Sequence, residues 1–122
     1  MRVLLIEDDA LVRQTLAETL ADEGIEVDGL GNAEDALILL AAGQVPDVLV
    51  ADIDLGAGLS GLDLASIARE RHSRVEVVLF SGSQPDPGQR PLGRRERFVR
   101  KPFAPAALAE AIRGAAAAAR AA

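Results

Sequence analysis

The sequence contains no cysteine, tryptophan or tyrosine, and it has only three phenylalanines among 122 residues. Without cysteine the chain can form neither a disulfide nor a reactive thiolate. With so few aromatic residues, the core must be built from aliphatic side chains. No apolar run reaches the roughly 18 residues that a membrane-spanning helix needs. A strand that begins by the third residue leaves no room for a signal peptide, so we expect a cytoplasmic location.

Positive charge is also scarce. The chain has 13 lysine and arginine residues against 19 aspartate and glutamate residues, which gives a net charge of -6. An acidic balance disfavours non-specific attraction to nucleic acid and to anionic lipid, so we expect neither DNA binding by this chain nor membrane association. Apolar residues make up 49% of the sequence, which is typical of a globular protein. The length predicts a single domain over residues 1–122.

Short apolar runs alternate with segments of helical periodicity. The runs predict strands at 2–6, 25–30, 48–51, 75–80 and 98–99, and the periodic segments predict helices at 10–23, 33–41, 62–71 and 105–122. This order predicts an α/β fold with a parallel sheet, helices on both faces and right-handed crossovers. Between residues 83 and 93, three prolines and two glycines make a regular helix unfavourable.

Polar residues follow four of the predicted strands: Glu7 and Asp8, Asp52, Ser81 and Lys101. Strand ends converge at one edge of a parallel sheet, where ligands bind. Clustered carboxylates raise one another's pKa, and a proton or a metal ion relieves the repulsion. Mg²⁺ suits such a site and leaves room for a phosphate, which a lysine and a hydroxyl would help to hold. One carboxylate could then form an aspartyl-phosphate, although an Asp after a strand more commonly caps the next loop.

The chain resembles the response-regulator receiver domains, the CheY-like family, from end to end. Four motifs carry the resemblance, in order and at strand ends: Val3–Asp9, Pro46–Asp52, Leu79–Ser81 and Phe98–Phe103. The resemblance implies a CheY-like (flavodoxin-like) doubly wound sheet of five parallel strands in the order 2-1-3-4-5. It also implies that the family's fourth helix is short or missing here, at residues 83–93, and that the output surface is remodelled.

The resemblance further implies the roles of the acidic residues. Asp52 would accept a phosphoryl group from a phosphohistidine on a histidine kinase or a histidine phosphotransfer protein. Mg²⁺ would be bound directly by Asp8 and Asp52, by Glu7 through water, and by the backbone carbonyl of Asp54. An acid at position 54 is less usual in the family, and its side chain could bind metal or repel the attacking water.

The resemblance also implies a switch. Lys101 would pair with Asp52 at rest and with the phosphate afterwards, and Ser81 would hydrogen-bond a phosphate oxygen. Phe98 would turn inward when Ser81 moves, which makes a two-state element. The Lys101-Pro102 bond matches the family's cis-peptide site.

Three other features have a structural interpretation that we prefer. Residues 56–61 spell G-x-G-x-x-G, but Asp52 and Asp54 would repel a pyrophosphate, so we interpret the segment as a flexible turn and not as a dinucleotide site. We assign no function to the single histidine, His72. The basic residues are interpreted as a solvated face, with docking of an acidic partner the less favoured reading; they are Arg90, Arg94, Arg95, Arg97 and Arg100.

We therefore predict a stand-alone receiver that catalyses only its own phosphoryl transfer and slow autodephosphorylation. It would signal by contact with an unidentified partner protein, or it would drain phosphate from a relay. Formation of a homodimer is a further possibility. One alternative is a degenerate receiver that binds proteins without phosphorylation, against which the complete residue set argues. Another is a Mg²⁺-dependent phosphatase with an aspartyl nucleophile. Such an enzyme usually has a general acid two residues after the nucleophile, and Asp54 has this position relative to Asp52. The sequence, however, offers no cap or substrate pocket.

Overall fold

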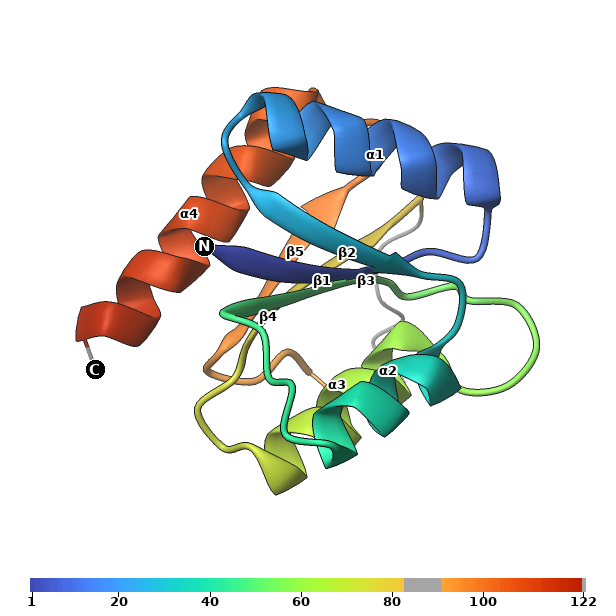
Figure 1. Ribbon diagram of the computed structural model, residues 1–122, viewed down its shortest axis with the longest axis vertical. Coiled ribbons are helices and arrows are strands. Elements are labelled where there is room, and N and C mark those ends of the chain that lie inside the picture. The colour runs from blue at the N-terminus through green and yellow to red at the C-terminus, as the bar shows by residue number, and fades with distance from the viewer. Residues whose placement is uncertain (83–90, 122) are drawn as a thin grey trace.

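The computed structural model describes residues 1–82 and 91–121 (Figure 1). Its strands form one parallel sheet in the order β2-β1-β3-β4-β5, which confirms the predicted topology. The strands are β1 (Arg2–Ile6), β2 (Glu26–Leu30), β3 (Val48–Asp52), β4 (Glu76–Ser81) and β5 (Glu96–Arg100). The helices in this part of the chain are α1 (Ala10–Asp22), α2 (Ala33–Ala41), α3 (Gly61–Arg71) and α4 (Pro105–Ala121).

The helices cover both faces of the sheet, with α1 and α4 on one side and α2 and α3 on the other (Figure 1). Side chains that alternate along each strand therefore enter two separate cores. In β1, for example, Val3 and Leu5 pack toward α4, whereas Leu4 and Ile6 pack toward α2 and α3. Every residue of β3 is buried, as its unbroken apolar run predicts for a central parallel strand.

Polar side chains cap the amino-terminal ends of α1 and α2. Asp9 caps α1 by accepting hydrogen bonds from the amides of Leu11 and Val12, at 3.0 and 3.1 Å. Asn32 caps α2 in the same way, through the amide of Asp35 at 2.8 Å. Among the described residues, β2 pairs only with β1, and its exposed, polar pattern is that of an edge strand.

Strand β5 is longer than the predicted Phe98-Val99 pair. It pairs with β4 from Val77 opposite Glu96 to Ser81 opposite Arg100. The apolar signal missed its charged ends, because backbone pairing with β4 stabilises them regardless of side-chain polarity. Two buried acidic residues begin these strands: Glu76 in β4 is 2% exposed, and Glu96 in β5 is 7% exposed.

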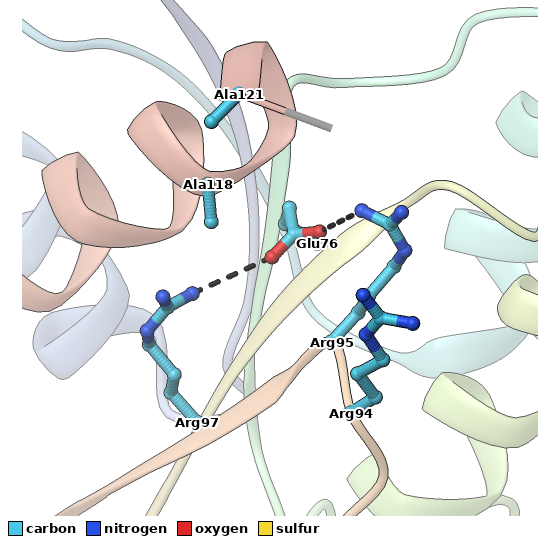
Figure 2. Close-up of a pocket in the computed structure, with 6 residues that line it drawn as sticks. All are labelled: Glu76, Arg94, Arg95, Arg97, Ala118 and Ala121. Atoms are coloured by element: carbon cyan, nitrogen blue, oxygen red, sulfur yellow. Dashed lines mark hydrogen bonds and ion pairs between the residues drawn. The ribbon is translucent and has the colours of Figure 1, made fainter.

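The prediction of a solvated basic face is wrong at Arg95. Its guanidinium binds Glu76 at 2.6 Å and its side chain is only 19% exposed (Figure 2). Arg97 also approaches Glu76, at 3.4 Å. A buried carboxylate needs such partners to compensate for its lost hydration.

The segment predicted to lack a helix lies partly outside the described residues, which omit 83–90. Residues 91–93, which are described, belong to neither a helix nor a strand. Within residues 1–82 and 91–121, no helix is both long and apolar enough to cross a lipid bilayer.

Candidate functional site

The predicted site residues meet at the carboxyl edge of the sheet. Asp52 is the last residue of β3 and Ser81 is the last residue of β4, while Glu7 and Asp8 follow β1 and Lys101 follows β5. The strands are in register there, with Ile6 opposite Ala51 and Ser81 opposite Arg100. The parallel topology therefore gathers residues from four separate stretches of sequence.

Three carboxylates form the floor of this site. Glu7, Asp8 and Asp52 each offer an oxygen atom, and these atoms all lie within 4.8 Å of one another. Glu7 is 2% exposed and Asp52 is 5% exposed, whereas Asp8 faces solvent. Hard oxygen donors at this spacing, with one side open to water, fit Mg²⁺, which keeps several of its waters when bound. These three side chains could hold the ion, and the backbone carbonyl of Asp54 as a further ligand stays a prediction.

Lys101 neutralises part of this negative charge. Its Nζ donates a hydrogen bond to Asp52 Oδ2 at 3.0 Å and lies 3.6 Å from Glu7 Oε1. It also lies 5.0 Å from the centroid of the Phe80 ring, within cation–π range. The expected contact between Lys101 and Asp52 is therefore present, and the Lys101-Pro102 peptide bond is cis, as the sequence predicts.

Asp54 makes a contact that the sequence did not reveal. Its carboxylate accepts a hydrogen bond from Ser81 Oγ at 2.8 Å, and its backbone amide donates to Asp52 Oδ1 at 2.9 Å. Both oxygens of Asp52 thus receive a donor, one from Asp54 and the other from Lys101. The signal for the Ser81 contact was the position of the two residues, since β3 and β4 are adjacent and both end at this edge.

Residues 3–113 match the family model of the response regulator receiver domain. The chain belongs to this family. Receiver domains bind Mg²⁺ at an acidic pocket and interact with histidine kinases or phosphotransfer proteins in two-component systems, and this chain has an acidic cluster of Glu7, Asp8 and Asp52. The resemblance inferred from the four motifs is confirmed.

Individual relatives agree with this assignment. The transcriptional regulatory protein PdtaR of Mycobacterium tuberculosis is 36% identical over 85 residues, which cover 70% of this chain and 41% of PdtaR. The C4-dicarboxylate transport transcriptional regulatory protein DctD of Pseudomonas aeruginosa is 33% identical over 114 residues, which cover 92% of this chain and 24% of DctD. This receiver therefore spans less than half the length of these curated relatives.

A solved structure gives the same result for the fold. The response regulator receiver protein from Sinorhizobium medicae superposes with a TM-score of 0.83 at 25% sequence identity, over 98% of this chain and 96% of that chain. This similarity confirms the CheY-like fold of the part of the chain that the structure describes.

Phe98 and His72 both lie outside the acidic cluster. Phe98, in β5, is half-buried and packs against the core formed by α2 and α3. Its inward turn on activation stays a prediction. His72 lies at the far end of α3, where its Nε2 is 3.2 Å from the carbonyl oxygen of Leu40, a contact that ties α3 to α2.

The loop between β3 and α3 is held by residues that sequence reasoning had left without a role. Glu34, in the first turn of α2, accepts a hydrogen bond from the amide of Leu59 at 2.9 Å. Gly58 adopts a φ of +90°, which favours glycine, and its backbone lies against the Glu34 carboxylate. The turn predicted at residues 56–61 is therefore anchored and not simply flexible.

Burial and repulsion perturb the site's acid–base chemistry. Removal from water, a hydrogen bond with Asp8 and the charge of Asp52 together raise the pKa of Glu7 from its usual 4.5 to about 7. The Asp9 amide and the Lys101 charge oppose this rise. For Lys101, burial alone would lower the pKa, but the hydrogen bond and charge of Asp52 and the charge of Glu7 outweigh it, so the pKa is raised.

The raised pKa of Glu7 predicts how the stability of the metal-free receiver depends on pH. Glu7 titrates near 4.5 when unfolded and near 7 when folded, so between these values the folded state binds more protons. The free energy of unfolding should therefore fall as pH rises from about 4.5 to about 7, by about 3 kcal/mol for this group. Urea unfolding in the presence of a chelator, from about pH 5 to about pH 8, measures this fall in the free energy of unfolding. The Glu7→Gln variant should show a flatter profile, and an equally steep profile would contradict the prediction.

Proposed function

We propose that this receiver is the phosphoacceptor of a two-component system or phosphorelay, and that Asp52 takes the phosphoryl group from a phosphohistidine on a histidine kinase or histidine phosphotransfer protein. The observation that supports this most is the environment of the Asp52 carboxylate. It is buried, clusters with the carboxylates of Glu7 and Asp8, and is paired with Lys101 at 3.0 Å. A carboxylate that only capped a loop would not need these partners.

The chemistry requires one bond to form and one to break. A carboxylate oxygen of Asp52 attacks the phosphorus of the phosphohistidine, the P–N bond breaks, and its electron pair returns to the imidazole, which takes up a proton. The product is an acyl phosphate on Asp52. Mg²⁺, when held by Glu7, Asp8 and Asp52, supplies positive charge that the phosphoryl oxygens need. Lys101 exchanges its contact with Asp52 for one with the new phosphate.

The signal follows from the hydrogen bond between Ser81 and Asp54. For Ser81 Oγ to donate to a phosphate oxygen, it must leave the Asp54 carboxylate. Phe98 lies opposite Leu79, two residues before Ser81 on the paired strand, so it can move into the space that Ser81 vacates. Phosphorylation would thereby shift the surface around Phe98, β4 and β5 between two states, which an unidentified downstream protein reads.

This hydrogen bond also bears on the rival phosphatase. A general acid must lie against the leaving group, whereas this hydrogen bond holds the Asp54 carboxylate on Ser81. The contact favours a role for Asp54 in restraining Ser81 over a role in protonating a leaving group. We therefore propose no enzyme activity on external substrates.

Phosphorylation should require Mg²⁺. We expect the protein to gain the mass of one phosphoryl group when it is incubated with acetyl phosphate and Mg²⁺, and no such mass when a chelator replaces the metal. Intact-mass spectrometry measures both conditions directly. A chain that binds Mg²⁺ but takes up no phosphate from acetyl phosphate or from a phosphohistidine donor would be a protein-binding module instead.

Removal of the Asp54 side chain should make phosphorylation easier. The Asp54→Ala substitution deletes the resting acceptor of Ser81, and a hydrogen bond to a charged group contributes about 1.5–3 kcal/mol. We expect the acetyl phosphate concentration for half-maximal phosphorylation to fall by about tenfold. Asp54→Asn, which keeps an acceptor oxygen, should give a smaller fall. Unchanged phosphorylation of Asp54→Ala would contradict this restraint, and poorer phosphorylation would show that Asp54 assists the transfer.

A further inference from the structure

A second polar site lies at the opposite edge of the sheet from Asp52. It is a cavity of about 310 Å³ between the amino-terminal ends of β4 and β5 and the last turn of α4 (Figure 2). Its described lining, which we term the arginine pocket, consists of Glu76, Arg94, Arg95, Arg97, Ala118 and Ala121. Because Glu76 begins β4 and Ser81 ends it, the arginine pocket and the acidic cluster lie at opposite ends of the same strand.

The arginine pocket carries an excess of positive charge. Three guanidinium groups face one carboxylate, so two positive charges are left over in a protein whose net charge is -6. The carbonyl end of α4 offsets only about half a charge. A local excess of this sign is therefore a property of the site and not of the overall composition.

Holding Glu76 does not account for all three arginines. Arg95 binds one carboxylate oxygen at 2.6 Å, and Arg97 is 3.4 Å from the other, at the long end of hydrogen-bond range. Arg94 is exposed and makes no hydrogen bond or ion pair with any residue that the structure describes. Each guanidinium has five N–H donors, and Arg95 and Arg97 each use one on Glu76. Among the residues that the structure describes, most of the N–H donors of Arg94, Arg95 and Arg97 therefore have no acceptor.

The lining also has an apolar side. Ala118 and Ala121 project from α4 on the side of the cavity where Arg97 lies, and Glu76 stands between them and the Arg95 guanidinium (Figure 2). Their small side chains leave the space that longer residues would fill. A ligand that fits both sides has a planar oxyanion for the arginines and a short hydrocarbon stem for the alanines. Glutamate and aspartate side chains meet this description, whereas inorganic phosphate has no apolar part.

We propose that the arginine pocket binds an acidic segment of a partner protein. A carboxylate of that segment accepts hydrogen bonds from Arg94 and Arg97, and its methylene stem packs on Ala118 and Ala121. Arg95 stays on Glu76 and supplies positive charge at the back of the cavity. The site would act independently of the phosphoryl chemistry, since none of its residues belongs to the acidic cluster.

The test uses a short peptide of alternating glutamate and glycine, with a glutamine–glycine peptide as the neutral control. NMR of the isotopically labelled protein follows the arginine Nε–H signals and the backbone amides of residues 94–97 during titration. We expect the glutamate peptide to shift these signals and the glutamine peptide to leave them unchanged. The binding should weaken as salt is added, because the contact is electrostatic.

Variants locate the binding. Arg94→Gln should raise the dissociation constant of the glutamate peptide by about tenfold, since it removes charge-assisted hydrogen bonds. Arg97→Gln should do the same while Arg95 still holds Glu76. Arg74→Gln is the matched control, because Arg74 is equally exposed but does not line the arginine pocket. Thermal unfolding of Arg94→Gln should equal that of the wild type.

Three outcomes would overturn the proposal. The first is an absence of shifts at residues 94–97 with the glutamate peptide. The second is an equal loss of affinity in Arg74→Gln, which would mean diffuse attraction to any basic surface. The third is binding of inorganic phosphate as tight as that of the peptide, which would make the pocket a site for a free oxyanion. Phosphorylation from acetyl phosphate should be unaffected by Arg94→Gln, so failure here is separable from failure at Asp52.

Discussion

The Asp52→Asn variant should take up no phosphoryl group from any donor and should remain folded. Asparagine has nearly the same shape as aspartate, so its side-chain oxygen can still accept the hydrogen bond that Lys101 gives at 3.0 Å. It lacks the carboxylate that attacks phosphorus. Loss of a nucleophile removes the covalent route entirely, so the expected effect is abolition of the reaction and not a reduced rate.

Substitution of Asp52 should also change the neighbouring acids. The charge of Asp52 is one of the causes that raise the pKa of Glu7, so its removal should bring that pKa down. The free energy of unfolding without metal should consequently equal or exceed that of the wild type. The affinity for Mg²⁺ should fall, because one of three carboxylate ligands is gone. Urea unfolding in a chelator and calorimetric Mg²⁺ titration measure these opposite effects.

Asp22→Asn is the matched control for this experiment. Asp22 is the last residue of α1 and is exposed, far along the chain from every residue of the site. The Asp22→Asn substitution makes the same chemical change away from the acidic cluster, so phosphorylation of this variant should match that of the wild type. Retention of phosphate by Asp52→Asn would mean that a different side chain is the nucleophile, and peptide mapping would identify it.

The Gly61→Ala variant should be strongly destabilised and should bind Mg²⁺ poorly. Gly61 begins α3, and its amide donates to the carbonyl oxygen of Ile53 at 2.9 Å. A β-carbon at this position would overlap the carbonyl oxygen of Asp52 and would lie 2.9 Å from both the Asp52 carbonyl carbon and the Ile53 Cα. These are backbone atoms, so no side-chain rotation can relieve the clash.

Either α3 or the end of β3 must therefore move. Overpacking of this kind costs about 3 kcal/mol, a large share of the 5–15 kcal/mol by which a typical domain is stable. A shift at the end of β3 also displaces Asp52 from Glu7 and Asp8, which weakens the metal site. Circular dichroism during urea unfolding measures the first effect, and Mg²⁺ titration of the folded fraction measures the second.

Gly82→Ala provides the comparison, since Gly82 follows the neighbouring strand β4. An added β-carbon there meets no atom of residues 1–82 and 91–121 within 4 Å, and the backbone is not in the left-handed region. The change in stability should stay within about 0.5 kcal/mol. If Gly61→Ala unfolded at the wild-type urea concentration, the close approach of α3 to the end of β3 would be wrong.

The sequence by itself determined the sheet and the position of the site. Unbroken apolar runs such as Val48–Ala51 can be satisfied only by burial on both faces, and this alone predicts central parallel strands. Asp52 and Ser81 each end such a run abruptly, which marks the edge at which they must lie. Because parallel strands share one carboxyl edge, the meeting of the acids with Lys101 followed from chain order before any distance was known.

The tertiary structure decided which polar groups touch. Ser81 and Asp54 are 27 residues apart, and Leu59 and Glu34 are 25 apart, so no local pattern links either pair. The same holds for Gly61. A β-carbon is excluded there only because the start of α3 lies against the backbone at the end of β3. A basic run such as Arg94–Arg97 has the same sequence whether it is solvated or folded over a buried Glu76. Periodicity reports burial along one element, whereas a polar contact depends on the spacing of two elements, and only packing sets that spacing.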